Sequence, residues 1–594
     1  TDKKGAARRQ PPYTFMEDDM LEVQFFDSVP EELLRFAVII SKSEGKWVFC
    51  KHRERTTWEV PGGRREPGET ILETARRELR EETGATDFTL KPICWYQLHF
   101  NDGGRGSFSL LCAADVRTMG ALLLIEAVFM AMALGVSLWY NEADNDVFLL
   151  STIVTLLAGV VGLLVGRRAE SRMGEREGYV IVAMVWVVFS AFGLLPYYLS
   201  GQVGSFTDAW FESMSGFTTT GATIIPDLEV ITHGLLFWRS LTQWIGGMGI
   251  IVLSIAILPI FGLNGMQLYA AEVSGLTYEK VSPRISDTAK MMWSIYVLLT
   301  VSEVVALWLC GMDVFDAVCH SFSTIATGGF STHNNSLEFY DSAAIHYTVT
   351  LFMFVSGINF VLLIYLLRGK VRNFFQDEEL RWYSVAVLVF AVMLTLGLYI
   401  ARPGWTGLHM ERAFRDSIFT VISSMTSTGY TISDYMYWPV VAWVVIFFLM
   451  LTGACAGSTA GGIKWVRLSI ILKNGVAEFQ RRIHPNAIIP VKLNEKAIPQ
   501  QTINNIMAFL IFYVFIIAVT VVIFCASGVN FDESIGAAVS AIGNVGISIG
   551  QFGPAGTYAE FPTLAKWVMS FVMLVGRLEI FTVLLLFTRA LWRK

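Results

Sequence analysis

The stretch Asp208-Ala-Trp-Phe-Glu-Ser-Met-Ser-Gly-Phe-Thr-Thr-Thr-Gly-Ala-Thr223 recurs in outline three more times in this chain. In each copy an acidic residue precedes a glycine by thirteen positions, and an apolar residue and then a hydroxyl residue follow that glycine. The other copies run from Asp316 to Ser331, from Asp416 to Thr431 and from Glu533 to Ser548. A register kept four times without a gap predicts one pore-forming unit that a single chain uses four times.

The composition indicates a membrane protein. Of 594 residues, 53% are hydrophobic and only 16% are charged, which is too apolar for a soluble protein of this size. Residues 1 to about 117 are charged and of soluble type, whereas most of the remainder is hydrophobic. The seven cysteines are scattered and odd in number, which argues against a disulfide framework or a thiolate metal site. The polar N-terminus predicts no cleavable signal peptide.

The hydrophobic part predicts about ten membrane spans, because a helix needs roughly 20 residues to cross a bilayer. Two extra spans come first, at Met119–Tyr140 and Phe148–Val165. Four units of span, re-entrant segment and span follow, with the spans paired as Tyr179–Leu199 with Leu235–Ile260, Met291–Cys310 with Ile345–Leu367, Tyr383–Ile400 with Trp438–Leu451, and Ile506–Ala526 with Leu564–Leu591. Basic loops stay in the cytoplasm, so both chain ends are predicted inside.

The predicted organisation has six parts. They are a cytosolic α/β segment at 1–116, the two additional spans at 117–177, and pore repeats at 178–262, 289–370, 380–475 and 500–594.

The glycine of each copy suits a cation filter. A dehydrated cation needs oxygens in place of its water, and backbone carbonyls can supply them where glycine permits unusual backbone angles. The run before each glycine is predicted to be a short helix whose partly negative C-terminal end faces the pore. The predicted filter positions are Thr220, Gly221, Gly328, Gly329, Thr428, Gly429, Val545 and Gly546. The alternative is ordinary loops or small-residue contacts between helices.

The N-terminal segment shows a small α/β pattern. Strands are predicted at Phe36–Ile40 and Lys46–Cys50 around a Glu44–Gly45 turn, and a further strand at Phe108–Ala113. A charged amphipathic helix is predicted at Thr70–Thr83.

Three carboxylates of that helix, Glu78, Glu81 and Glu82, crowd one face. They would repel one another unless a hard cation lay among them, and magnesium on a pyrophosphate is the natural one. The alternative is a surface helix rich in Glu and Arg pairs.

Residues from about 117 to 594 resemble the membrane subunit of the Trk/Ktr/HKT cation-transporter superfamily, specifically the bacterial Trk potassium-uptake type. The resemblance rests on the four loops, the two extra spans, the small-residue run Gly453–Lys464 and the run Val575-Gly-Arg-Leu-Glu579. It implies potassium uptake across the bacterial inner membrane through one fourfold pseudo-symmetric pore per subunit. It also implies a homodimer gated by a cytosolic ring of nucleotide-binding regulatory subunits. Membrane lipid is the other expected partner, and no nucleic acid is expected to bind. Glycine at all four filter positions goes with potassium in this family.

Two features beside the filter are gate candidates. Glycine is a poor helix former, so the run containing Gly453, Gly457, Gly461 and Gly462 can be an intramembrane loop, which is the gate in the resembling family. Its alternative is a helix-packing patch. Arg577 is an intramembrane charge that the family places in the pore, and its alternative is pairing with Glu579 or another acid.

Other polar residues in the spans are expected to be structural. Arg239 and Glu126 are expected to be paired, and Gln243–Gly249 is expected to be packing.

The segment from about 30 to 116 resembles a Nudix hydrolase. The match includes Pro61-Gly62-Gly63 before the helix and Gly84 after it. The resemblance implies magnesium held at Gly63, Glu78, Glu81 and Glu82, with Glu81 and Glu82 catalytic and Glu69 supporting the loop. The segment is shorter than that fold normally requires, so an incomplete domain is predicted. This leaves two alternative functions, a membrane-tethered pyrophosphohydrolase and a nucleotide sensor fused to a channel, although ten spans exceed what an anchor needs.

The four loops are not identical. Thr428-Gly429-Tyr430 most resembles a potassium filter, whereas Asn544-Val545-Gly546 lacks hydroxyl groups beside its glycine. This asymmetry predicts a looser filter than four identical loops would form.

Overall fold

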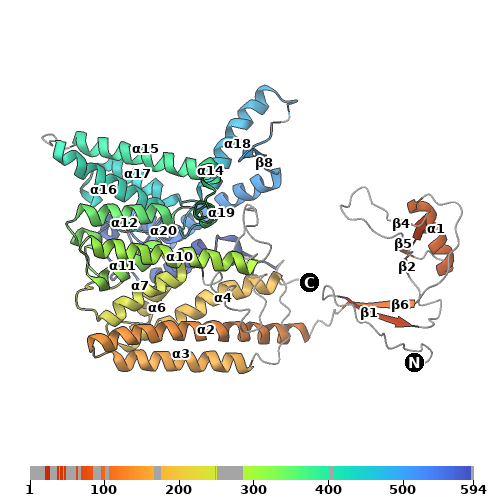
Figure 1. Ribbon diagram of the computed structural model, residues 1–594, viewed down its shortest axis with the longest axis horizontal. Coiled ribbons are helices and arrows are strands. Elements are labelled where there is room, and N and C mark those ends of the chain that lie inside the picture. Colours follow the sequence, from red (N-terminus) through yellow and green to blue (C-terminus); the bar gives the residue numbers. More distant parts are fainter. Residues whose placement is uncertain are drawn as a thin grey trace. The chain divides into compact units, whose positions relative to one another are not determined.

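The protein, seen in a computed structural model, divides by its contacts into two units, Thr1–Phe108 and Ser109–Lys594 (Figure 1). The structure describes residues 21–26, 36–38, 41–43, 46–48, 62–64, 69–83, 95–100, 106–165, 175–247, 249, 285–401, 407–487 and 489–589. The ends of two predicted spans, beyond residue 249 in Leu235–Ile260 and beyond 589 in Leu564–Leu591, lie outside these residues.

Three antiparallel strand pairs and one helix make up the described part of the first unit. The pairs are β1 (Leu21–Phe26) with β6 (Trp95–Phe100), β2 (Phe36–Val38) with β5 (Gly62–Arg64), and β3 (Ser41–Ser43) with β4 (Lys46–Val48). The hairpin predicted around Glu44–Gly45 is therefore formed by β3 and β4, and the predicted strand at residue 36 pairs with β5 instead.

The predicted helix is confirmed as α1 (Ile71–Thr83). Thr70 begins it through a capping box. The Thr70 N–H donates to the Glu73 carboxylate at 2.7 Å, and the Glu73 N–H donates to the Thr70 hydroxyl at 3.3 Å. The hydrogen bond to the Thr70 backbone N–H holds the pKa of Glu73 below its ordinary value.

The strand predicted at Phe108–Ala113 is wrong, because these residues are helical. They belong to α2 (Gly106–Tyr140), a helix of 35 residues that continues into the first span. No turn signal separates Leu110-Leu-Cys-Ala-Ala114 from the span, so helix propagates through it. The boundary predicted at residue 116 lies inside this helix.

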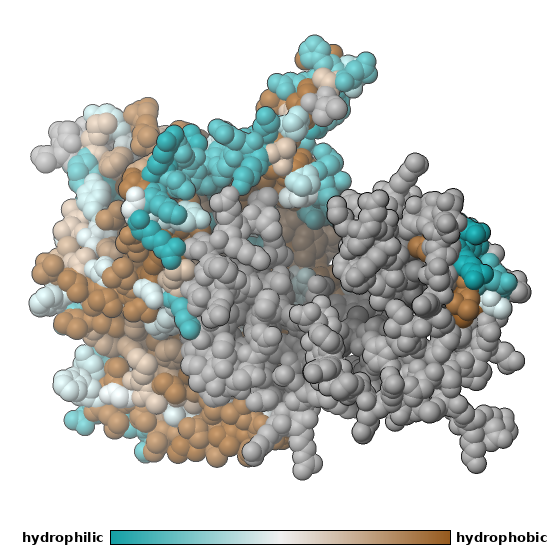
Figure 2. All heavy atoms as spheres, turned by 45° about the vertical axis from the view of Figure 1, so that its right-hand side comes forward, coloured by the Kyte–Doolittle hydropathy of each residue, from teal (hydrophilic) through white to brown (hydrophobic). Residues whose placement is uncertain are grey.

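The second unit is helical, and six of its described helices are long and apolar enough to cross a membrane. They include both predicted extra spans, α2 and α3 (Asn145–Val165). The other four begin the repeats, within α4 (Glu175–Gly193) continuing into α5 (Leu195–Leu199), α10 (Ile285–Leu309), α15 (Glu378–Ala401) and α19 (Gln500–Ala526). Figure 2 shows hydrophobic residues over much of this unit's surface, as lipid contact requires.

Each repeat continues with a helix whose C-terminal half is largely buried and leads to the glycine of its own sequence copy. These pore helices are α6 (Phe206–Phe217), α11 (Val314–Ile325), α16 (Gly407–Met425) and α20 (Phe531–Gly543). Short 3-10 turns follow three of the filter segments, at η4 (Ser336–Phe339), η5 (Tyr435–Tyr437) and η6 (Gly550–Phe552).

Among the described residues, the second helix of three repeats is short or interrupted, so these three do not pass as single straight spans. In the first repeat, the second helix α7 (His233–Gly247) reaches the edge of the described residues. That of the second repeat bends by 102° between α12 (Ala343–Ser356) and α13 (Phe360–Leu367). The third, α17 (Val440–Leu451), ends at a loop of residues 452–464, the run predicted from the sequence and called the intramembrane loop below. The fourth breaks between α21 (Thr563–Arg577) and α22 (Phe581–Leu586).

Two smaller parts join the repeats. The helix α14 (Val371–Gln376) precedes α15, and a projection formed by α18 (Trp465–Ile483), β7 (Lys492–Leu493) and β8 (Lys496–Ala497) precedes α19. Hydrophilic residues gather on this projection (Figure 2).

Candidate cation filter and its supports

All four pore helices end in the same turn. The residue two positions before the filter glycine has a left-handed backbone, with φ of 52° at Thr219, 55° at Thr327, 53° at Ser427 and 52° at Asn544. The N–H of the next residue then donates to a carbonyl five positions back, at 2.8–2.9 Å in every repeat. This is the Schellman ending, which satisfies the last helical carbonyls without lengthening the helix.

A serine recurs at the same position before this turn in all four repeats and was not predicted from the sequence. The accepting carbonyls belong to Ser215, Ser323, Ser423 and Ser540, which all lie six positions before the filter glycine and are fully buried. The signal was present in the sequence, since the same residue type recurs at the same offset four times.

The four filter glycines close a ring. Each has a positive φ, between 74° and 87°. A Cβ added to Gly221 would lie 2.1 Å from the carbonyl oxygen of Gly328, and one added to Gly329 would lie 1.8 Å from that of Thr428. A Cβ on Gly429 would lie 2.1 Å from the oxygen of Val545.

The fourth contact returns to the first repeat, because a Cβ on Gly546 would lie 2.3 Å from the oxygen of Thr220. Each glycine thus packs against the carbonyl of the next repeat, and the fourth packs against the first. We call the backbone oxygens of Thr220, Gly328, Thr428 and Val545 the carbonyl ring. All eight predicted filter residues lie in this ring or beside it, and a larger side chain at any glycine would meet a carbonyl oxygen.

The side chains that support the ring differ between the repeats. Hydroxyl pairs support two opposite repeats, with Thr218 and Thr220 2.8 Å apart and Thr426 and Thr428 2.7 Å apart. In the fourth repeat the Asn544 amide instead donates to the Thr220 hydroxyl at 3.0 Å.

A buried ion pair lies behind the first two filter segments. Arg239 of α7 donates to Glu212 of α6 at 2.6 Å, and their side chains are 2% and 0% exposed. Glu212 also accepts from the Ile224 N–H at 3.0 Å, and Arg239 donates to the Ser331 carbonyl at 2.9 Å. The predicted structural pairing of Arg239 is confirmed, and the pair ties two filter segments together. Among the described residues, Glu126 has no hydrogen-bond partner, so its predicted pairing finds no support.

Gln243 was expected to be a packing residue, but its side chain makes two specific hydrogen bonds. Its amide nitrogen donates to the Gly328 carbonyl at 2.7 Å, and its amide oxygen accepts from the Phe330 N–H at 3.0 Å. One buried side chain therefore brackets Gly329 on both sides.

A polar cluster joins the loops that follow the first two filter segments. His333 contacts Asp316 at 3.2 Å through Nε2 and Glu229 at 3.1 Å through Nδ1. Burial alone would lower the pKa of His333, but the hydrogen bonds to these two carboxylates outweigh it and raise the pKa above its ordinary value. Asp316 also accepts from Thr332 and Tyr340, so the acidic residue that opens the second copy anchors its own loop.

The intramembrane loop is fastened at several points. Glu379 of α15 accepts from the N–H groups of Ala456 at 2.7 Å and Val466 at 3.1 Å. Thr459 donates to the Ile325 carbonyl at the end of the second pore helix, at 3.1 Å. The Gly461 N–H donates to the Ser427 hydroxyl at 2.6 Å. The loop therefore lies against the ends of two pore helices.

The glycines predicted for the gate are required by these close approaches. A Cβ on Gly453 would lie 2.0 Å from the Gly461 carbonyl oxygen, and one on Gly461 would lie 2.3 Å from that of Gly543. Gly457 and Gly462 have φ of 73° and 66°, which side chains rarely adopt.

Arg577 holds the loop from the fourth repeat. Its guanidinium donates to the carbonyls of Thr459 at 2.7 Å, Gly246 at 2.7 Å and Gly247 at 2.8 Å. Glu579, its predicted alternative partner, forms an ion pair with Arg467. Arg577 thus bridges the intramembrane loop and the end of α7.

In the first unit, Arg77 gathers the carboxylates of the Nudix-like helix. It contacts Glu69 at 3.0 Å, Glu78 at 2.8 Å and Glu81 at 3.2 Å, and the hydrogen bond to Glu69 is the largest cause of its raised pKa. Gly63 lies in β5, and the side chain of Glu82 is outside the described part. Among the described residues, no group of three His, Cys, Asp or Glu is placed to hold a metal. Carboxylate oxygens are nevertheless donors that magnesium prefers.

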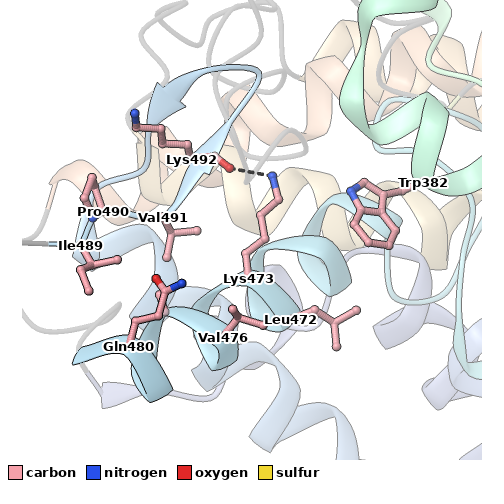
Figure 3. Close-up of a pocket in the computed structure, with 10 residues that line it drawn as sticks. Trp382, Leu472, Lys473, Val476, Gln480, Ile489, Pro490, Val491 and Lys492 are labelled. Carbon is pink, nitrogen blue, oxygen red and sulfur yellow. Dashed lines mark hydrogen bonds between the residues drawn. The ribbon is translucent and has the colours of Figure 1, made fainter. Parts of the chain in front are cut away.

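A pocket of about 430 Å³ lies between the projection and α15 (Figure 3). Lys473 lines it and donates to the Lys492 carbonyl at 2.8 Å, and Trp382 of α15 forms part of its wall. Exposed apolar residues continue along α18, namely Leu472, Val476, Phe479 and Ile483.

Apolar spans around a closed ring of backbone carbonyls define a class, the membrane proteins that conduct or transport cations. Residues 145–594 match the family TrkH, described as a cation transport protein, and residues 32–116 match the NUDIX domain. The chain therefore belongs to the TrkH family of cation transport proteins, as its motifs predicted.

Individual relatives agree with this assignment. The Trk system potassium uptake protein TrkH of Salmonella typhimurium is 39% identical over 485 residues, which cover 81% of this chain and 99% of that protein. The Trk system potassium uptake protein TrkG of Escherichia coli is 31% identical over 477 residues, covering 80% and 97%. The crystal structure of the potassium transporter TrkH from Vibrio parahaemolyticus matches with a TM-score of 0.73 at 35% identity, covering 81% of this chain and 99% of that one.

Proposed function

We propose that this chain takes up potassium across the bacterial inner membrane and that the ion passes through the carbonyl ring. The observation that carries the proposal is the closure of the ring, in which each filter glycine packs against the next repeat's carbonyl. Such oxygens can replace an ion's hydration shell, and their number and field strength favour the larger potassium ion over sodium. On this path the ion would pass Gly221, Gly329, Gly429 and Gly546.

The chain's own residues would control passage in three ways. The carbonyl ring dehydrates the ion, the Glu212–Arg239 pair keeps two filter segments in place, and the intramembrane loop closes the path below them. Arg577 would hold that loop closed and repel a waiting cation. Support for this gate comes from its three hydrogen bonds, which join the loop to α7.

The partners implied by the family are part of the proposal. The chain would form a homodimer, and a cytosolic ring of nucleotide-binding subunits would bind to the side where the basic loops gather. Both ends of the chain would lie on that cytoplasmic side. The basic projection and the exposed apolar residues Phe479 and Ile483 on α18, each 72% exposed, support an interface there.

Complementation tests the pore. A bacterium lacking potassium uptake should grow at low potassium with this chain but not with Gly429→Asp, because the new side chain would fill the ring. Gly204→Asp is a matched control, since Gly204 is exposed in the loop before α6 and a Cβ there would come no nearer than 3.9 Å to another atom. Equal growth with the chain and Gly429→Asp, at equal membrane expression, would refute the pore.

A second activity is proposed for the N-terminal unit. The NUDIX match supports magnesium-dependent hydrolysis of a nucleoside diphosphate derivative. Magnesium would supply the Lewis acid, and Glu78, Glu81 and Glu82 would hold it near the Gly63 loop. Glu81 and Glu82 would also be the catalytic carboxylates. Arg77 would keep Glu69 against the helix while the three glutamates bind magnesium.

A further inference from the structure

We propose that Gln243 of α7 is a positioning residue that sets the ion selectivity of the carbonyl ring, an inference that rests on the pore proposed above. Gln243 is fully buried and belongs to the first repeat, yet both of its hydrogen bonds go to the filter segment of the second. Its contacts are with Gly328 and Phe330, the two neighbours of a filter glycine.

The sequence of the second repeat is explained by this side chain. The residue before the filter glycine is Thr220, Thr428 or Val545 in the other three repeats, but it is Gly328 in the second. A Cβ on Gly328 would lie 2.4 Å from Cδ of Gln243 and 2.6 Å from its amide oxygen. Glycine is therefore required here because the glutamine occupies the space that a side chain would need.

The hydrogen bond makes one ring oxygen different from the others. The Gly328 carbonyl accepts an amide N–H, whereas among the described residues no side chain donates to the carbonyls of Thr220, Thr428 and Val545. A carbonyl that already accepts a hydrogen bond offers a weaker field to an ion and turns less freely. Both effects favour a large cation, because a strong, adaptable field rewards the smaller sodium ion.

Removing the amide should therefore lower the preference for potassium. Gln243→Met keeps an unbranched side chain of similar length but neither donates to Gly328 nor accepts strongly from Phe330. One lost hydrogen bond corresponds to roughly a three- to tenfold change in an equilibrium ratio, so we expect the sodium-to-rubidium flux ratio to rise by that factor. A purely structural role would reduce both fluxes together and leave the ratio unchanged.

The test uses the full chain in liposomes, with radioactive sodium and rubidium uptake measured at equal amounts of folded protein. Thr300→Val is the matched control, since it removes the acceptor of a 3.1 Å hydrogen bond from Trp244, the next residue of the same helix. Its flux ratio should equal that of the unchanged protein. Gly429→Asp reports on the pore itself and should abolish both fluxes.

The outcomes separate the two proposals. If Gln243→Met leaves the ratio unchanged while Gly429→Asp abolishes flux, the pore stands and the role of Gln243 is refuted. If Gly429→Asp leaves flux intact, the pore and this inference both fail. Should Gln243→Met not fold, Gln243→Leu removes the amide donor without adding a charge and should raise the same ratio. Gly328→Ala should impair flux less in a Gln243→Ala background, and equal impairment in both backgrounds would also count against the contact.

Discussion

At the scale of single residues, the filter depends on charges that water does not reach. Glu212→Gln would leave the Arg239 guanidinium buried without its ion partner, and removal of one member of such a pair typically costs about 3–5 kcal/mol. We expect a corresponding loss of stability in thermal unfolding of the purified protein. Glu478→Gln, which removes the exposed partner of Arg481, should cost less than about 1 kcal/mol.

The double variant Glu212→Gln with Arg239→Met provides the internal check. Because it removes both charges, it should recover part of the stability lost in Glu212→Gln. Equal stability of the unchanged protein and Glu212→Gln would contradict the structural role of the pair.

The His333 bridge predicts a pH dependence. The pKa of His333 is raised above the ordinary 6.5, so its bridge to Asp316 and Glu229 contributes fully below that pH. The contribution is lost as the pH rises through the folded-state pKa. Thermal unfolding should therefore show stability falling with rising pH in this window, and His333→Gln should flatten the curve. The exposed His484→Gln is the control, and an unaltered curve in His333→Gln would exclude the bridge as its source.

The functional role of a residue was predictable where it followed from the residue's position in a repeated sequence pattern or in a span. The filter glycines were predictable because glycine recurs at the same position of four sequence copies. The pairing of Arg239 was predictable because a charged side chain within a membrane span needs a partner. The role of Gln243 was not visible, since its partners Gly328 and Phe330 lie 85 and 87 positions along the chain. Long-range contacts of this kind depend on how two repeats pack.

At the scale of elements, the broken second helices are the parts that the sequence described least well. Hydropathy predicted spans at Ile345–Leu367 and Leu564–Leu591, but the structure bends one at residues 357–359 and interrupts the other after Arg577. Hydropathy alone did not show these two breaks, whereas the glycine run after α17 did predict the break in the third repeat. In the second repeat, Asn359 accepts the Val361 N–H at 2.8 Å and starts α13.

The interrupted elements predict a leak on loss of Arg577. Arg577→Gln would lose most of the donors that bind Thr459, Gly246 and Gly247, and it would remove a positive charge from the proposed ion path. We expect higher rubidium flux into liposomes in the absence of any partner protein. Arg368→Gln, an exposed change at the end of α13, should not alter the flux. A flux in Arg577→Gln that stays at the level of the unchanged protein would contradict the proposed gate.

At the scale of the whole molecule, two units with unlike chemistry share one chain. The sequence predicted both, because the change from charged to apolar composition is abrupt. It placed the last strand of the first unit wrongly, since Phe108–Ala113 carries strand-forming side chains but is helical as part of α2. It also missed β1 and β6, whose pairing joins residues 69 to 79 positions apart.

The two units should be separable in function, which gives the last prediction. Glu81→Gln removes a proposed magnesium ligand and one of the contacts of Arg77, but Glu69 and Glu78 still hold that arginine. We expect the full chain to release phosphate products from nucleoside diphosphate derivatives with magnesium, and Glu81→Gln to lose that release. Rubidium flux should be the same in both proteins, because the carbonyl ring and its supports lie entirely in the second unit. Product release by the unchanged chain without magnesium, or by Glu81→Gln at an equal rate, would rule out the proposed site. Loss of flux in Glu81→Gln would instead make the first unit a regulator of the pore.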